Sequence, residues 1–190
     1  MTNSLVNKNQ TVQKHVTGSV VSARDSFVTQ VASPHVNFGL QRIVSACLAE
    51  IANGIIADTF LQQLQHYNRP PSERNLETKL IGSGQNSAYY EFAIAAKEDF
   101  AKFVEVIGRT PSGQLVLVSA FKHAYSIYGE KIKPKIGQLT FSQQESIFDE
   151  LIVEYLSQNL TGLPNFYGRN EAIGLLFYLA DNCFIEYAKC

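Results

Sequence analysis

The clearest periodic pattern of apolar residues begins at Asn37. Apolar side chains recur there at the i, i+3, i+4 and i+7 spacing of one helical face, as in an amphipathic helix. They are Leu40, Ile43, Val44, Cys47, Ile51, Ile55, Phe60 and Leu64. Pro70 and Pro71 remove two backbone donors, so the helix must end before them. The pattern predicts one long helix from Asn37 to Tyr67.

The segment from Leu76 to Phe121 fits two different secondary structures. FVEVI and QLVLV are apolar runs separated by GRTPSG, and LETKLI and YYEFAIA flank GSGQNSA in the same way. Two such runs joined by a turn rich in glycine or proline are typical of a β-hairpin. The competing interpretation is a helix over residues 88–107, where aromatic and aliphatic residues recur at helical spacing. One helical face cannot hold the continuous run Leu115–Val118, so we predict an antiparallel β-meander.

Helical patterns return after Ile136. Ser142 and Glu145 have the spacing of a capping box, and an apolar stripe follows them. Asn170 is the expected N-cap of a last helix. The predicted fold class is therefore α+β, with a long N-terminal helix, a central antiparallel β-meander and two C-terminal helices packed on the sheet. An all-α helical bundle is the alternative, and it follows if residues 88–107 form one helix.

The first 34 residues differ in composition from the rest of the chain. They are polar and rich in amide side chains, and they end at Pro34. We predict that residues 1–34 form a flexible or partner-binding N-terminal arm and that residues 35–190 form a single globular domain. A content of 45% hydrophobic and 17% charged residues is sufficient for such a domain to bury a core.

Cysteine spacing and hydropathy indicate the compartment. Three cysteines without a CxxC spacing indicate neither a disulfide framework nor a thiolate metal site, which fits a reducing environment. No apolar run approaches the roughly 18 residues that cross a bilayer, and MTNSLVNKNQ lacks the apolar core of a secretory signal. We therefore predict a soluble cytoplasmic protein that does not contact a membrane.

The familiar catalytic and cofactor motifs are incomplete in this sequence. Gly82 and Gly84 begin a GxGxxG-like string, but Ser87 stands in place of the third glycine and no Gly-Lys-Ser/Thr follows. The four histidines lack HxxxH or HExxH spacing, and no GxSxG surrounds a serine. We expect no metal and no cofactor, and the lack of an activated nucleophile favours a non-catalytic protein. Four carboxylates have the spacing of a solvated helix face: Glu145, Asp149, Glu150 and Glu154.

One charge pattern suggests a function, in the stretch FKHAYSIYGEKIKPK. Residues 122–135 contain four lysines and one glutamate, whereas residues 136–160 contain four acidic residues and no lysine or arginine. Lysines that contact phosphates, interleaved with tyrosines that stack on bases, are typical of single-stranded nucleic-acid binding. The candidate binding residues are Lys122, Tyr125, Tyr128, Lys131, Lys133 and Lys135. For a metal-independent ribonuclease, His123 is the candidate general acid or base, Lys122 the stabiliser of charge on phosphorus, and His35 a further candidate.

Two other interpretations of the same stretch involve no nucleic acid. It is either a solvated linker or a surface that complements acidic segments in protein contacts. The net charge of −1 gives no global attraction to nucleic acid, and 12 Phe with 9 Tyr supply the aromatic residues that interfaces favour. We therefore predict a small non-catalytic protein–protein interaction or assembly protein with a protein partner or a second copy of itself. An RNA-binding protein or ribonuclease is the alternative.

Overall fold

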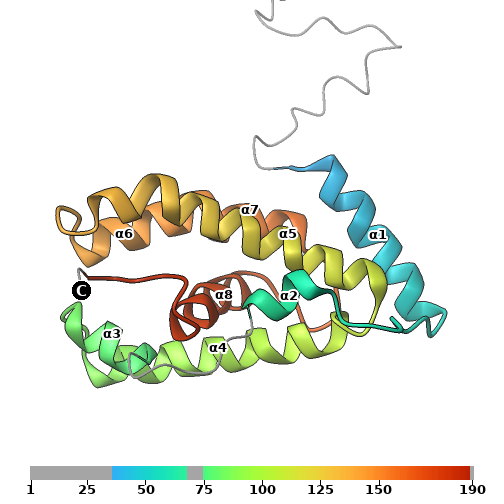
Figure 1. Ribbon diagram of the computed structural model, residues 1–190, viewed down its shortest axis with the longest axis horizontal. Helices are drawn as coiled ribbons and strands as arrows, with labels where there is room; N and C mark the ends of the chain where they lie inside the picture. The colour runs from blue at the N-terminus through green and yellow to red at the C-terminus, as the bar shows by residue number, and fades with distance from the viewer. Residues whose placement is uncertain (1–35, 68–74, 189–190) are drawn as a thin grey trace, which may run out of the picture. The chain divides into compact units, whose positions relative to one another are not determined.

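The computed structural model describes residues 36–67 and 75–188. All regular structure in these two ranges is helical, and they contain no strand or sheet (Figure 1). The α-helices are α1 (Phe38–Ala52), α2 (Gln62–Tyr67), α3 (Leu76–Gly82), α4 (Ser87–Ile107), α5 (Pro111–Ile127), α6 (Phe141–Phe148), α7 (Glu154–Asn159) and α8 (Arg169–Asp181). The irregular helices are the π-helix η1 (Tyr128–Ile132), the 3₁₀-helix η2 (Lys133–Lys135) and the π-helix η3 (Asp149–Val153).

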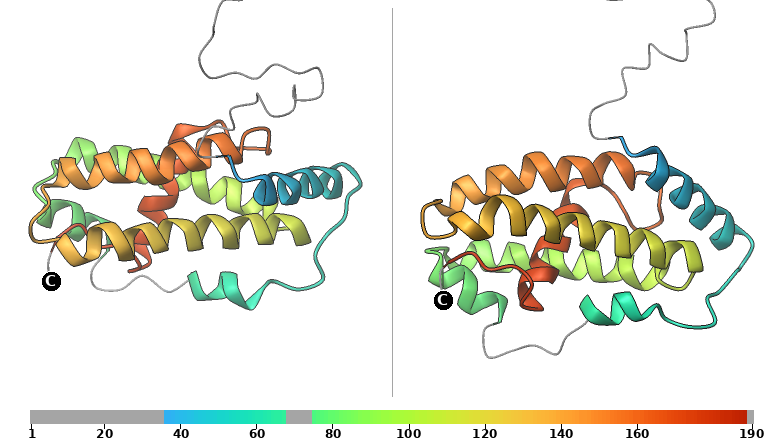
Figure 2. Two further views of the ribbon diagram at one scale, coloured as in Figure 1. Left: turned by 90° about the horizontal axis from the view of Figure 1, so that it is seen from above. Right: turned by 45° about the horizontal axis from the view of Figure 1, so that its top comes forward.

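Three long helical rods form the frame of the fold. The π-helix η3 joins α6 to α7 without a break, so these elements make one rod that runs antiparallel to α5. Figure 1 shows α4 on the opposite side of α8 from this pair, and Figure 2 shows α8 crossing steeply between them. Helix α1 packs against α5. The fold is therefore a helical bundle built around α8.

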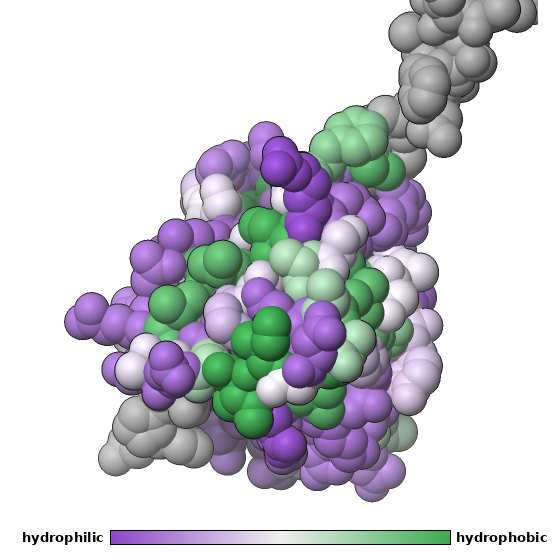
Figure 3. All heavy atoms as spheres, turned by 90° about the vertical axis from the view of Figure 1, so that its right-hand side faces the viewer, coloured by the Kyte–Doolittle hydropathy of each residue, from purple (hydrophilic) through white to green (hydrophobic). Residues whose placement is uncertain are grey.

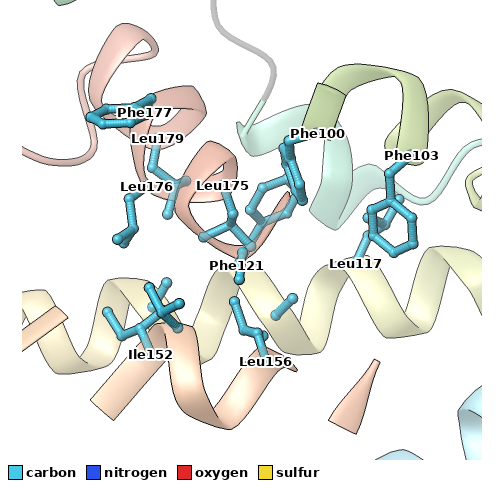
Figure 4. Close-up of a cluster of buried hydrophobic side chains, with 14 of the residues drawn as sticks. Phe100, Phe103, Leu117, Phe121, Ile152, Leu156, Leu175, Leu176, Phe177 and Leu179 are labelled. Carbon is cyan, nitrogen blue, oxygen red and sulfur yellow. The ribbon is translucent and has the colours of Figure 1, made fainter. Parts of the chain in front are cut away.

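The hydrophobic core lies where α8 meets the three rods (Figure 4). Its fully buried members include Phe100, Phe103, Leu117, Ile152, Leu156 and Leu175. These side chains come from α4, α5, the α6–α7 rod and α8. Folding therefore requires the whole bundle to assemble, because no pair of helices encloses this core alone.

The predicted β-meander is wrong, because residues 76–121 form α3, α4 and α5. GSGQNSA is the turn between α3 and α4, in which Gly84 has a φ of 88° and Asn86 caps α4. GRTPSG joins α4 to α5, with Thr110 as the N-cap and Pro111 in the first turn, where an intrahelical donor is not needed. The strings that resemble hairpin turns are therefore helix ends and starts, and the all-α bundle given as the alternative fits the structure.

The apolar run Leu115–Val118 fits a helix because α5 is buried on more than one face. Val116 and Leu117 are 0% exposed and Val118 is 5% exposed. The β-branched residues lose at most about 0.7 kcal/mol each relative to alanine in a helix. Burying a large apolar side chain contributes about 1.5–3 kcal/mol. Burial on several sides therefore outweighs the preference of these residues for strands.

The predicted single helix from Asn37 to Tyr67 is also wrong, although both of its ends are helical. Asn37 caps α1 as a side-chain acceptor, and α1 then ends at Ala52 with Asn53 as its C-cap. Gly54 follows with a φ of 66°, a left-handed conformation that ends a helix and that glycine adopts without strain. The chain then leaves the helix axis before α2 begins.

The segment 53–61 is held by hydrogen bonds to α5 and to the turn before it. The Ala57 N–H donates to the Arg109 carbonyl at 2.8 Å. The Gln114 side chain, which is 2% exposed, accepts from the Leu61 N–H at 2.7 Å and donates to the Thr59 carbonyl at 3.1 Å. The buried Gln114 amide thus satisfies two backbone groups, the Leu61 N–H and the Thr59 carbonyl, that have no helical partner in this segment.

The C-terminal helices are present, but they pack on other helices and begin before the predicted positions. The capping box is formed by Thr140 and Gln143, not by Ser142 and Glu145. The last helix already includes Asn170 in its first turn. Because Ser, Thr, Glu and Gln are frequent here, two overlapping boxes fit the same spacing rule.

The end of α8 is held by a buried lysine from α3. Lys79 is 3% exposed, and its ammonium group donates to the carbonyls of Ala180 and, at 3.4 Å, of Ile185. The Glu186 carboxylate lies 3.4 Å from the same ammonium group. A cation is favourable at the C-terminal end of a helix, and this carboxylate and the two carbonyls satisfy its charge and donors. Lys79 therefore fixes the chain that follows α8.

Helices α4 and α8 approach so closely that only glycine fits at position 174. A Cβ atom built on Gly174 would lie 2.1 Å from the Ala96 carbonyl oxygen of α4. The obstacle is backbone, which cannot rotate aside as a side chain would. This close approach sets the spacing between the two helices.

We expect Gly174→Ala to lower the free energy of unfolding by about 1–3 kcal/mol, because α4 and α8 must separate to admit the new methyl group. Gly129→Ala is the matched control, since nothing lies within 4 Å of a Cβ atom at that position. The control should change stability by less than about 1 kcal/mol in either direction. Urea unfolding followed by circular dichroism measures both, and equal stabilities of the two variants would contradict the proposed contact.

Candidate functional site

The basic-aromatic stretch lies at the end of α5 and in the two short helices after it. Lys131, Lys133 and Lys135 are exposed there, in η1 and η2. Tyr128 is 3% exposed, and its hydroxyl accepts a hydrogen bond from the Glu186 N–H at 3.2 Å. Tyr128 is thus placed as a core residue. Of the candidate nucleic-acid-binding residues in η1 and η2, the three lysines are exposed and Tyr128 is buried. Nucleic-acid binding by this stretch remains a prediction.

The other candidates of this stretch lie on α5. Lys122 is exposed, and Tyr125 is 40% exposed with its ring edge-to-face against Phe184. His123 is half-buried, with Nε2 2.9 Å from the Leu151 carbonyl and its ring stacked on Tyr155 at a centroid distance of 3.9 Å. This contact joins α5 to the α6–α7 rod. His35 lies outside the described residues, so the structure does not show whether it approaches His123.

The described part of the chain contains an aromatic pocket. It lies between the first half of α4, the α6–η3 rod, α8 and the segment after α8, is partly open to solvent, and has a volume of about 80 Å³. Apolar side chains lining it are Phe92, Phe148, Val153, Ile173, Leu176 and Phe177, and polar ones are Tyr89, Glu145, Asp149, Arg169 and Tyr187. One water needs about 10–15 Å³, so the aromatic pocket has room for a small polar group.

A carboxylate and a phenol meet in the aromatic pocket. The Tyr89 hydroxyl of α4 donates to Glu145 Oε1 of α6 at 2.5 Å. Among the described residues, this is the only hydrogen bond that the Glu145 side chain makes. Burial, the hydrogen bond to Glu145 and nearby negative charge all raise the pKa of Tyr89. Tyr89 therefore stays protonated, and a Glu145 oxygen remains for another donor.

Tyr187 is the second phenol of the aromatic pocket. Its side chain is 4% exposed and contacts the rings of Phe141 and Phe148. Burial, followed by the charge of Glu145, raises the pKa of Tyr187. Its hydroxyl makes no hydrogen bond within the described ranges, whereas its backbone carbonyl accepts from the Gln144 amide at 3.0 Å. The residue is thus fixed through its backbone and its ring.

The rim of the aromatic pocket contains an ion pair. The Arg169 guanidinium contacts Asp149, and the two side chains are 60% and 43% exposed. A pair exposed to this degree contributes little to stability. It does, however, neutralise Asp149, so that Glu145 is the lining carboxylate without a cationic partner in the described residues.

Sequence reasoning missed this site because its polar residues lie on separate elements. Glu145 and Asp149 have the four-residue spacing of a helix face, and this pattern predicts exposure to solvent. Tyr89 lies in the stripe of the helix that was given only as an alternative. An aromatic residue 56 positions from its carboxylate partner leaves no local signal.

A second surface feature lies at the other end of the bundle. Ile55, Ile56 and Phe60 belong to the non-helical segment 53–61 and are 47%, 72% and 45% exposed. We call these three residues the apolar end patch. Figure 3 shows apolar side chains gathered on this end of the molecule. Exposed apolar residues that gather at one place mark interaction sites more often than scattered ones do.

Two kinds of feature are missing from the described residues. They hold no group of three or more His, Cys, Asp or Glu side chains placed to bind a metal ion. None of their helices combines the length and the apolar character that crossing a membrane requires. Cys47 is fully buried beside the Thr110 hydroxyl, and burial raises the pKa of its thiol.

The fold and these features define the class as an all-helical bundle domain. Residues 75–187, more than half of the chain, match the family CTD9, C-terminal domain 9 of the ABC-three component (ABC-3C) systems. The chain therefore belongs to this family. The matched residues include the whole aromatic pocket, whereas α1, α2 and the apolar end patch precede them. No curated protein and no solved structure is similar enough to match.

The raised pKa of Tyr187 predicts a loss of stability in alkali. An unfolded tyrosine ionises near pH 10 and the folded residue ionises later, so its contribution is present below about pH 10 and declines above it. The free energy of unfolding should fall there by up to about 1.4 kcal/mol per pH unit for this residue. Urea unfolding at several alkaline pH values measures the slope. Tyr187→Phe should make the slope shallower, and an unchanged slope would contradict the prediction.

Proposed function

We propose that the chain is a protein-assembly component of an ABC-three component system and that the apolar end patch contacts another component of that system. The observation that carries this proposal is the exposure of Ile55, Ile56 and Phe60 in one short segment. The family description, which names a system of three components, supports a protein partner.

The segment that carries the apolar end patch is already ordered for binding. Hydrogen bonds from Ala57 to Arg109 and from Leu61 to Gln114 fix its backbone against α5 and the preceding turn. The cost of ordering a loop is a large part of what association must overcome. A preformed segment avoids that cost, so its apolar side chains contribute more of their burial energy to binding.

The energy of the three side chains sets the size of the expected interface. Complete burial of a large apolar side chain contributes about 1.5–3 kcal/mol, and Ile55 and Phe60 are already about half-buried, whereas Ile56 is 72% exposed. Association costs at least about 4 kcal/mol in lost freedom of motion. The three side chains alone therefore cannot supply the free energy of a stable complex. The apolar end patch is the centre of a larger interface that also includes surrounding polar contacts.

We expect Ile56→Asp to weaken association with the other components at least tenfold, because it places a charge in the centre of the apolar contact. Ile81→Asp is the matched control, since Ile81 is an isoleucine on α3 that is 58% exposed. Co-expression with the other components, followed by size-exclusion chromatography with light scattering, measures the complex. Circular dichroism checks that both variants keep the wild-type helix content.

Two results would contradict this assignment. If Ile56→Asp and Ile81→Asp retain the complex equally, the apolar end patch is not the contact. The second result is that the chain alone elutes at a multiple of 21.1 kDa and that Ile56→Asp elutes as the 21.1 kDa monomer; the apolar end patch then joins two copies of this chain instead.

A further inference from the structure

The charges lining the aromatic pocket leave one carboxylate uncompensated. Two carboxylates and one guanidinium line it, and the guanidinium of Arg169 pairs with Asp149. Glu145 receives one neutral hydrogen bond, from Tyr89, and no ion pair within the described residues. The pocket therefore presents a negative charge beside an apolar wall, which is a favourable place for a cation and an unfavourable one for an anion.

The hydroxyl of Tyr187 offers a second polar contact. The residue is 4% exposed and lines the aromatic pocket, yet its hydroxyl has no hydrogen-bond partner among the described residues. It is not one of the fully buried polar atoms that lack a partner, so its oxygen is open to the pocket and to solvent. A ligand that donates a hydrogen bond can therefore reach it.

The aromatic rings complete the arrangement. Tyr89, Phe92 and Phe177 are mutually edge-to-face, with centroids 5.9–6.1 Å apart and interplanar angles of 62°, 81° and 89°. The three rings, in steeply inclined planes, form an apolar corner. Aromatic rings attract cations through their quadrupole, and this attraction is strongest where water is excluded.

We propose that the aromatic pocket binds a primary alkylammonium group, as carried by a small amine or by a lysine side chain. Glu145 is the counter-ion, the Tyr187 hydroxyl accepts a hydrogen bond from the ammonium group, and the aromatic rings contact the alkyl chain. The pocket volume of about 80 Å³ suits the end of such a chain and not a large ligand. A guanidinium is less suitable, because it pairs best with both oxygens of a carboxylate and one Glu145 oxygen already accepts from Tyr89.

This site is independent of the apolar end patch. The aromatic pocket lies at the end of the bundle formed by α6 and the start of α4, and the apolar end patch lies at the end formed by α1 (Figure 1). Ligand binding can therefore be measured on the full chain alone, without the other components of the system.

The direct test is a nuclear magnetic resonance titration of the isotope-labelled full chain with n-butylammonium chloride. Butyrate has the opposite charge at similar size, 1-butanol is neutral, and tetramethylammonium has the charge but no N–H donor. We expect saturable shifts at Tyr89, Glu145 and Tyr187 with n-butylammonium and at least tenfold weaker binding of the other three compounds. A lysine that is acetylated at its N-terminus and amidated at its C-terminus distinguishes a lysine side chain from a small amine as the ligand. If it binds as tightly as n-butylammonium, the ligand is a lysine side chain; if it binds more weakly, the ligand is a small free amine.

Two variants separate binding from structural roles. Glu145→Gln removes the counter-ion and should weaken n-butylammonium binding about tenfold, whereas Glu150→Gln, an exposed position in the same rod, should leave it unchanged. Tyr187→Phe removes a hydroxyl that has no described protein partner. It should therefore weaken binding several-fold while the urea unfolding midpoint at pH 7 stays within error of wild type.

The outcomes that overturn the proposal are specific. They are no saturable binding of n-butylammonium, binding of 1-butanol or butyrate as tight as that of n-butylammonium, and unchanged affinity in Glu145→Gln. None of these results bears on the assembly role, because Ile56→Asp tests that role at the other end of the bundle. Conversely, loss of the complex in Ile56→Asp leaves the amine titration unaffected.

Discussion

The contact between α4 and α8 at Gly174 and Ala96 determines how the rest of the bundle is arranged. Because a side chain at position 174 would collide with backbone, the two helix axes can approach as closely as they do only with glycine there. That approach buries Phe100 and Phe177 against each other's helices and leaves α8 enclosed by the three rods. It also brings Tyr89 of α4 within edge-to-face distance of Phe177 of α8. The core and the aromatic pocket thus depend on the same backbone contact.

Buried polar side chains then fix the segments that the core does not reach. Lys79 binds the carbonyls at the end of α8 and the carboxylate of Glu186, and this interaction places Tyr187, the next residue, over the aromatic pocket. Gln114 does the same for the segment that carries the apolar end patch. In both cases a side chain satisfies backbone groups that no helix satisfies, so an irregular segment gains one defined conformation.

The sequence predicts the helical faces well and the connections between them poorly. The stripe of Leu40, Val44 and Cys47 is buried as its spacing indicates, because helical periodicity is a local property. GRTPSG was misassigned because proline, glycine and threonine serve hairpin turns and helix caps alike, and only the tertiary partners decide between them. Gly54 ends α1 for a related reason. Its left-handed conformation is open to glycine without strain, but the direction of the chain after it depends on hydrogen bonds to Arg109 and to Gln114 of α5.

The aromatic pocket was beyond sequence reasoning for a different physical reason. The spacing of Glu145 and Asp149 says that they share a helix face but not what covers that face, and here α4 and α8 cover part of it. Among the described residues Asp149 gains a cation from α8, whereas Glu145 gains only a phenol from α4. This asymmetry between two residues one helical turn apart gives the pocket its negative charge. It arises from the crossing of α8 over α4, so the same close contact at Gly174 that organises the core also sets the charge of the pocket.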